Sequence, residues 1–208
     1  MLLYKNCWTW SGGCLTPHPR RDSGQRNSKT GNSLSFTRSA QLAAWSSELL
    51  ESWRQDLRSA QAEGRNPINE KYIYMLEQVD PEQYSVLKSD LPEASLEKLW
   101  LVDWICHAQI AWQESLLKKY PCLTQNSRAI RRSTDDQERI SYETYLRGEL
   151  MTCSVDTLRL YARQLEQNEK AGQNFCETVL MNIVQQFGFD SLEAADKYVM
   201  GKKAVREK

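Results

Sequence analysis

The stretch of this sequence best suited to chemistry runs from Ser141 to Thr152, SYETYLRGELMT. On a helix, where successive residues turn by about 100°, two arcs of this stretch hold most of its polar groups. One arc contains Tyr142, Tyr145, Leu146 and Glu149, and the adjoining arc contains Glu143, Arg147 and Leu150. The side of the helix expected to be buried therefore combines leucine with phenols, carboxylates and a guanidinium.

Two spacings within this stretch predict contacts along the helix itself. Glu143 and Arg147 have the i, i+4 spacing of an intrahelical ion pair. Tyr145 and Glu149 share that spacing, so the phenol can donate a hydrogen bond to the carboxylate.

Two interpretations of these groups remain open. In the structural one, they form a satisfied buried network that fixes the register of the helix, since ion pairs within helices are common and many contribute little. In the functional one, they line a cavity and handle protons, because a carboxylate buried without a partner has a raised pKa. The candidate catalytic residues are then Glu149 and Tyr145, and the candidate substrate-binding residues are Arg147, Glu143 and Tyr142.

The segment before this helix adds a possible anion site. Arginines near the free backbone N–H groups of a helix N-terminus can hold a carboxylate or phosphate. Arg131 is the candidate here, between Arg128 and Arg132. The alternative is a solvated basic loop whose charge is neutralised by the acidic residues that follow it, Asp135, Asp136 and Glu138.

Several familiar chemistries are missing from the sequence. It contains no G-x-G-x-x-G, no P-loop and no G-x-S-x-G motif. His107 follows Asp103 by four residues, but without a Glu-x-x-His motif we expect this pair to contact each other rather than a metal. We therefore expect neither a metal nor a cofactor.

Charge and apolar content limit the possible partners. Lysine plus arginine equals aspartate plus glutamate at 27 each, which does not favour nucleic-acid binding. No stretch approaches the ~20 apolar residues of a membrane span, and the opening MLLYKNCWTWSGGCL is too interrupted for a signal peptide. The six cysteines include no C-x-x-C pair, which is typical of reduced thiols. We expect a cytoplasmic protein that binds neither membrane nor nucleic acid.

Periodic apolar residues predict helices from about Ser39 onward, the first of them a single helix from Ser39 that Gly64 ends. The predicted fold is all-α, a single bundle of about seven to eight helices, because no run of alternating residues suits a strand pair. Residues 1–37 are expected to be a flexible N-terminal segment, 38–200 the helical domain and 201–208 a charged tail. Residues 121–140 break the pattern and are expected to form a long loop.

Three pieces of the sequence resemble a family of bacterial and fungal proteins catalogued as a domain of unknown function. They are Ala44–Ser52, Gly64–Asn66 and, most specifically, the block ETYLRGEL at Glu143–Leu150. The resemblance covers about residues 36 to 198 and departs from the family pattern over residues 11–35. Similarity to fungal members encoded with the fusaric acid pathway implies a role in mycotoxin or other secondary-metabolite biosynthesis. It implies no particular reaction and no catalytic residues.

Two functions follow as hypotheses. The first is a cofactor-free enzyme or binder acting on a small acidic metabolite, with Arg147 or Arg131 holding its acidic group. The second is a non-catalytic helical module that binds another protein of the pathway through an exposed apolar patch.

Overall fold

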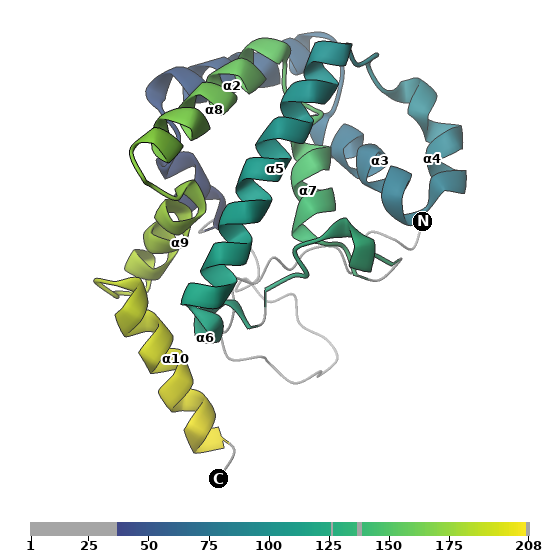
Figure 1. Cartoon of the computed structure of the whole chain (residues 1–208). Helices are drawn as coiled ribbons and strands as arrows, with labels where there is room; N and C mark the ends of the chain where they lie inside the picture. Colours follow the sequence, from purple (N-terminus) through teal and green to yellow (C-terminus); the bar gives the residue numbers. More distant parts are fainter. Residues whose placement is uncertain (1–36, 126, 137–138, 207–208) are drawn as a thin grey trace, which may run out of the picture. The chain divides into compact units, whose positions relative to one another are not determined.

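The computed structural model describes residues 37–125, 127–136 and 139–206. No strand occurs in these ranges, so the all-α prediction is confirmed (Figure 1). None of the helices in them is long and apolar enough to span a membrane. A helical segment at residues 37–43 is followed by α2 (Ser47–Ala62), α3 (Pro67–Val79), α4 (Pro81–Leu87), α5 (Leu96–Lys119), α6 (Pro121–Thr124), α7 (Tyr142–Leu150), α8 (Val155–Lys170), α9 (Phe175–Gln186) and α10 (Leu192–Arg206), with single 3-10 turns η2 (Lys88–Asp90) and η3 (Arg132–Thr134).

Local sequence signals set most of the helix boundaries. A side-chain oxygen accepts a hydrogen bond from a backbone N–H at the start of seven of the described helices, which satisfies donors that have no partner inside the helix. These residues are Ser46, Asn66, Asp80, Ser95, Ser141, Ser154 and Ser191. Gly64 lies just after the C-terminal end of α2, and its φ is 68°, a backbone conformation that glycine adopts without steric cost.

Two expectations about the helices are corrected. The single helix expected from Ser39 onward is interrupted before α2, because the backbone of Ser46 is extended and its hydroxyl accepts from the Leu49 N–H at 3.2 Å. The long loop expected at residues 121–140 contains α6 and η3. Pro121 occupies the first position of α6, where its missing N–H costs nothing.

The described chain forms two compact units. Among the described residues, unit 1 comprises 37–44, 113–125, 127 and 175–206, and unit 2 comprises 45–112, 128–136 and 139–174. The expected flexible segment, 1–37, lies almost entirely outside the described residues. In unit 1, α10 packs against α6 and α9, and it continues to Arg206, beyond the expected boundary at residue 200.

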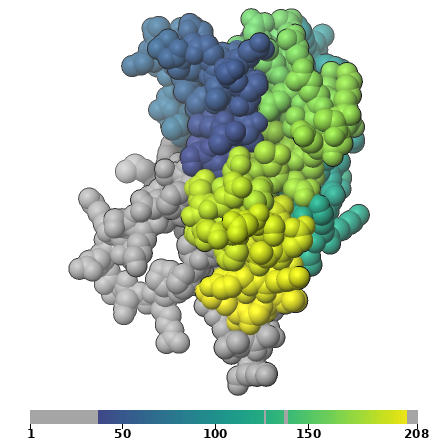
Figure 2. Space-filling model, turned by 90° about the vertical axis from the view of Figure 1, so that its left-hand side faces the viewer, coloured from purple at the N-terminus to yellow at the C-terminus, as the bar shows by residue number. Residues whose placement is uncertain are grey.

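Unit 2 contains three helix pairings. The helix α3 packs against α7 and α4 (Figure 1), and α2 packs against α8 (Figure 2). Trp45 is buried at 7% exposure, with its ring edge-on to Trp53 at 5.7 Å and to Tyr161 at 5.3 Å between ring centroids. Trp100 on α5 is 62% exposed.

Candidate functional site

The start of α7 is held by a carboxylate and by its own N-cap. The Ser141 hydroxyl accepts from the Thr144 N–H at 3.2 Å. Asp135 accepts from the Ser141 N–H at 2.6 Å and from the hydroxyls of Ser141 and Thr144. A negative charge at this position also matches the positive end of the helix dipole. Asp135 therefore fixes the helix start.

Close packing of α3 on α7 depends on Gly148. A Cβ at this position would lie 2.8 Å from the Met75 Cγ and 3.0 Å from the Lys71 carbonyl oxygen. Neither contact is sterically allowed without movement, so glycine lets the two helices approach. The glycine of the ETYLRGEL block thus has a packing role, and it brings Lys71 within reach of α7.

Lys71 joins the two residues predicted to handle protons. Its ammonium lies 2.9 Å from Glu149 Oε2 and 3.2 Å from the centroid of the Tyr145 ring. The side chains of the ion pair are 12% and 13% exposed. No hydrogen bond joins the Tyr145 phenol to Glu149 in the described part of the chain, so the predicted contact is replaced by one through Lys71.

A second cation flanks the same ring. The Arg128 guanidinium carbon lies 5.2 Å from the Tyr145 centroid, and its Nη1 donates to the Ile140 carbonyl at 3.0 Å. The Arg128 Nε–H is buried without an acceptor. Among the described residues Arg128 has no carboxylate partner.

The second arc of α7, which carries Glu143 and Arg147, contacts parts of the chain other than α3. Arg147 Nη1 lies 2.6 Å from Asp103 Oδ1 on α5, and Glu143 accepts from the Arg132 N–H at 2.9 Å. The predicted ion pair between Glu143 and Arg147 is therefore wrong. Because each residue pairs with a different part of the chain, this arc fixes α7 between its neighbours.

The expected pair of Asp103 with His107 is also replaced, because Asp103 binds Arg147 and His107 is exposed. Next to this pair Cys106 is buried, and burial raises the pKa of its thiol to about 12. A thiol that stays protonated is a poor nucleophile.

Tyr142 belongs to a buried polar chain. Its phenol donates to Gln109 Oε1 at 2.7 Å, and the Gln109 amide donates to the Tyr161 phenol at 3.0 Å. Gln109 is 2% exposed, so these bonds link α7, α5 and α8 inside unit 2. Tyr142 therefore points toward α5, whereas Tyr145 meets Lys71 of α3.

Arg131 lies in the exposed connection before α7. Its carbonyl oxygen accepts from the Thr134 hydroxyl at 2.8 Å and from the Thr134 N–H at 3.3 Å, which closes η3. Of the acidic residues expected to neutralise this loop, Asp136 pairs with Arg139 at 2.8 Å and Asp135 caps α7, whereas Glu138 lies outside the described residues.

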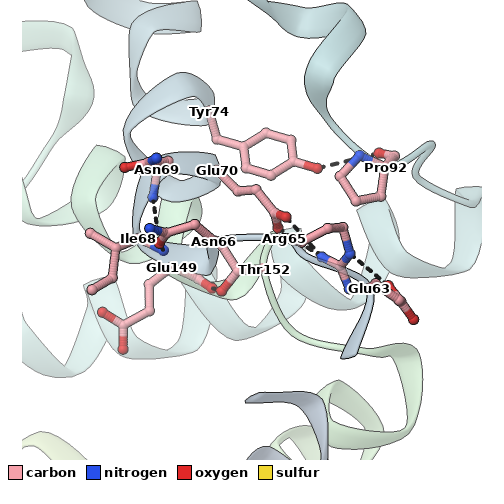
Figure 3. Close-up of polar contacts among 10 residues, drawn as sticks. All are labelled: Glu63, Arg65, Asn66, Ile68, Asn69, Glu70, Tyr74, Pro92, Glu149 and Thr152. Atoms are coloured by element: carbon pink, nitrogen blue, oxygen red, sulfur yellow. Dashed lines mark hydrogen bonds and ion pairs between the residues drawn. The ribbon is translucent and has the colours of Figure 1, made fainter. Parts of the chain in front are cut away.

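Residues that sequence reasoning missed form a second cluster at the start of α3 (Figure 3). Both oxygens of the buried Glu70 accept from Arg65 Nη1, at 2.8 and 3.0 Å, and Arg65 Nε donates to Glu63 at 2.7 Å. Tyr74 donates to the Pro92 carbonyl at 3.4 Å, and burial raises the pKa of its phenol to about 12. In Figure 3 the Glu149 carboxylate points away from this cluster.

The fold and the site define an all-α protein with a polar helix face packed between neighbouring helices. Residues 18–197 match the family described as "Protein of unknown function (DUF4125)", and the chain belongs to this family. No curated protein and no solved structure matches the chain.

Proposed function

We propose that this protein binds a small acidic metabolite, with Arg128 holding the acidic group beside the Tyr145 ring. The supporting observation is the pairing of charges around α7. Three cations in this region have acidic partners: Lys71 with Glu149, Arg132 with Glu143, and Arg147 with Asp103. Arg128 has none among the described residues.

The chemistry of Arg128 favours a carboxylate or phosphate. The Nε and Nη2 atoms of a guanidinium form an edge that matches two acidic oxygens, and such charge-assisted bonds are strong. At Arg128 the Nη1 atom is used by Ile140, and Nε has no acceptor. Because Nε is covered, the side chains over it must move aside when the ligand enters. The Tyr145 ring then offers a flat apolar wall for a planar ligand.

Catalysis by Glu149 and Tyr145 would be a further step of the same proposal. It requires the Lys71 ammonium to leave the Glu149 carboxylate, since the two are 2.9 Å apart. The geometry therefore supports binding more directly than proton transfer. The two arginines predicted to hold the acidic group, Arg147 and Arg131, would extend the anion site only if the ligand reached beyond Tyr145.

Binding is tested by titrating the full chain with a panel of small carboxylic acids, including benzoate, picolinate and glutarate, in a calorimeter. We expect at least one acid to bind and the Arg128→Met variant to bind it about 10- to 100-fold more weakly, the loss typical of a charge-assisted hydrogen bond. Arg139→Met is the matched control, because Arg139 is exposed and pairs with Asp136. Equal affinity in wild type and Arg128→Met, or no binding by any acid, would contradict the proposal.

The pathway we propose is fungal secondary metabolism of the fusaric acid type, on the sequence resemblance alone. Deleting the gene and profiling small acidic metabolites should reveal a compound that accumulates or disappears. A Glu149→Gln gene that restores the normal profile would exclude catalysis by that carboxylate while leaving a binding role.

A second candidate function is a module that binds another protein of the pathway. Its support is an exposed apolar patch at the start of α5, where Leu96 is 86%, Leu99 40% and Trp100 62% exposed. Their spacing places them on one side of the helix. Replacing Leu96 and Trp100 by serine should remove a protein partner in pull-downs and leave acid binding intact. If the double variant recovers the same proteins as wild type, this second function is wrong.

A further inference from the structure

Two cations lie against the ring of Tyr145, but only one of them is paired with a carboxylate. The Lys71 ammonium is 3.2 Å from the ring centroid and 2.9 Å from Glu149 Oε2, and the Arg128 guanidinium carbon is 5.2 Å from the same centroid. The described residues give Arg128 no carboxylate. The charged groups at this ring therefore carry an excess of one positive charge.

The backbone at the start of α7 has no N–H group left for an anion. The N–H groups of residues 141–144 all donate within the chain, at 2.6 to 3.2 Å. Their acceptors are the side chains of Asp135 and Ser141 and the carbonyl oxygens of Ala129 and Ile130. The charge of Asp135 matches the positive end of the helix dipole. An acidic ligand at Tyr145 therefore depends on side-chain cations.

The two cations differ in what they can offer to such a ligand. Arg128 donates only through Nη1, and its Nε and Nη2 atoms make no hydrogen bond in the described part of the chain. Lys71 is engaged by Glu149 in a largely buried pair, where water screens charges weakly. One acidic group can thus bind Arg128, whereas Lys71 is already neutralised.

We propose that Glu149 is a specificity-determining residue that restricts this site to ligands with one acidic group, namely monocarboxylates. The inference rests on the acid binding proposed above and adds the charge of the ligand. One carboxylate on Arg128 balances the excess positive charge. A second carboxylate, or a phosphate with two charges, would be repelled by Glu149 because Lys71 has no charge to spare for it.

The test compares benzoate with phthalate, isophthalate and terephthalate, which add a second carboxylate to the same ring in three directions. Calorimetric titration of the full chain should show each diacid binding wild type about 10-fold or more weakly than benzoate, because like charges meet in the complex. The Glu149→Gln variant keeps the shape of the side chain and frees Lys71. At least one diacid should then bind about 10-fold or more tightly than benzoate, through a charge-assisted bond to Lys71.

Two variants control for charge and for the partner of the second carboxylate. Glu51→Gln makes the same substitution in an exposed pair with Arg54 on α2, and it should keep the wild-type preference for benzoate. Lys71→Met/Glu149→Gln lacks the cation as well, and it should not gain diacid binding. The wild-type comparison needs no variant, so it decides the question even if Glu149→Gln does not fold.

The failure of this inference can be told from the failure of acid binding itself. If a diacid binds wild type as tightly as benzoate, or if folded Glu149→Gln keeps the preference for benzoate, Glu149 does not set the charge of the ligand, whereas binding that depends on Arg128 stands. If benzoate does not bind wild type, or binds Arg128→Met equally well, the underlying site is wrong and this inference is overturned with it.

Discussion

On α7 the ionisable side chains bind residues far away in the sequence rather than their helical neighbours. Glu149 pairs with Lys71, 78 residues earlier, and Arg147 pairs with Asp103. The i, i+4 spacing permits an intrahelical pair, but such pairs stabilise a helix by only about 0.2–0.5 kcal/mol. The pair of Lys71 with Glu149 is largely shielded from water, with side chains 12% and 13% exposed. Spacing alone could therefore identify the polar helix but not the partners of its residues.

The ion pair of Lys71 with Glu149 gives the first prediction. Replacing Lys71 by methionine keeps the apolar part of the side chain and leaves a mostly buried carboxylate without its cation. We expect the free energy of unfolding, measured in urea, to fall by about 2–4 kcal/mol, somewhat below the range for fully buried pairs because both groups keep some exposure.

The double variant Lys71→Met/Glu149→Gln supplies the control for that measurement. Because no unpaired charge remains, its loss should be smaller than the sum of the two single losses by at least about 1 kcal/mol. Strictly additive losses would show that the two side chains do not interact.

At the scale of elements, the helix boundaries were largely predictable and the breaks were not. Helix starts can be predicted at Ser141, Ser154 and Asn66, because the side-chain oxygen of an N-cap residue accepts from a backbone N–H at most three residues further along the chain. The interruption before α2 was missed because the spacing of apolar residues continues across it. The extended backbone of Ser46 interrupts the helix there without interrupting the apolar spacing. Short helices such as α6 carry too few residues for a period to be detected.

The contact of α3 with α7 gives a prediction at this scale. Alanine at Gly148 would place a methyl group 2.8 Å from Met75 Cγ and 3.0 Å from a backbone oxygen. We expect Gly148→Ala to lower the free energy of unfolding by about 1–3 kcal/mol, because overpacking outweighs the better helix propensity of alanine.

Gly201 in α10 is the matched control, since it is exposed and a Cβ there would meet nothing within 4 Å. Gly201→Ala should leave stability unchanged or raise it by up to about 1 kcal/mol. If both alanine variants were equally stable, the close approach at Gly148 would not be a constraint.

At the scale of the whole molecule, the all-α class follows from composition and period, whereas the division into two units depends on contacts between distant segments. Unit 1 shows this dependence. The buried Tyr120 donates to Glu193 Oε1 on α10 at 2.7 Å and contacts Glu177 Oε1 on α9 at 3.1 Å. Lys119 pairs with the same Glu177 oxygen at 2.7 Å, and the Leu123 N–H donates to Asp196 on α10 at 2.8 Å. Acidic side chains thus hold α9 and α10 to the end of α5.

This arrangement predicts a pH dependence for the stability of the molecule. The hydrogen bond from Tyr120, the largest influence, lowers the pKa of Glu193 below its ordinary value of 4.5. A carboxylate whose pKa is lower in the folded state contributes stability that is complete above its unfolded pKa and disappears as pH falls through the folded pKa. Wild type should therefore lose stability relative to Tyr120→Phe on acidification from about pH 6 to about pH 3.

Urea unfolding of both proteins measures the difference in the free energy of unfolding. The control is Tyr198→Phe, at an exposed tyrosine of α10, whose difference from wild type should stay constant over this pH range. A Tyr120→Phe difference that stays constant or widens toward pH 3 would mean that the phenol does not stabilise the charged carboxylate.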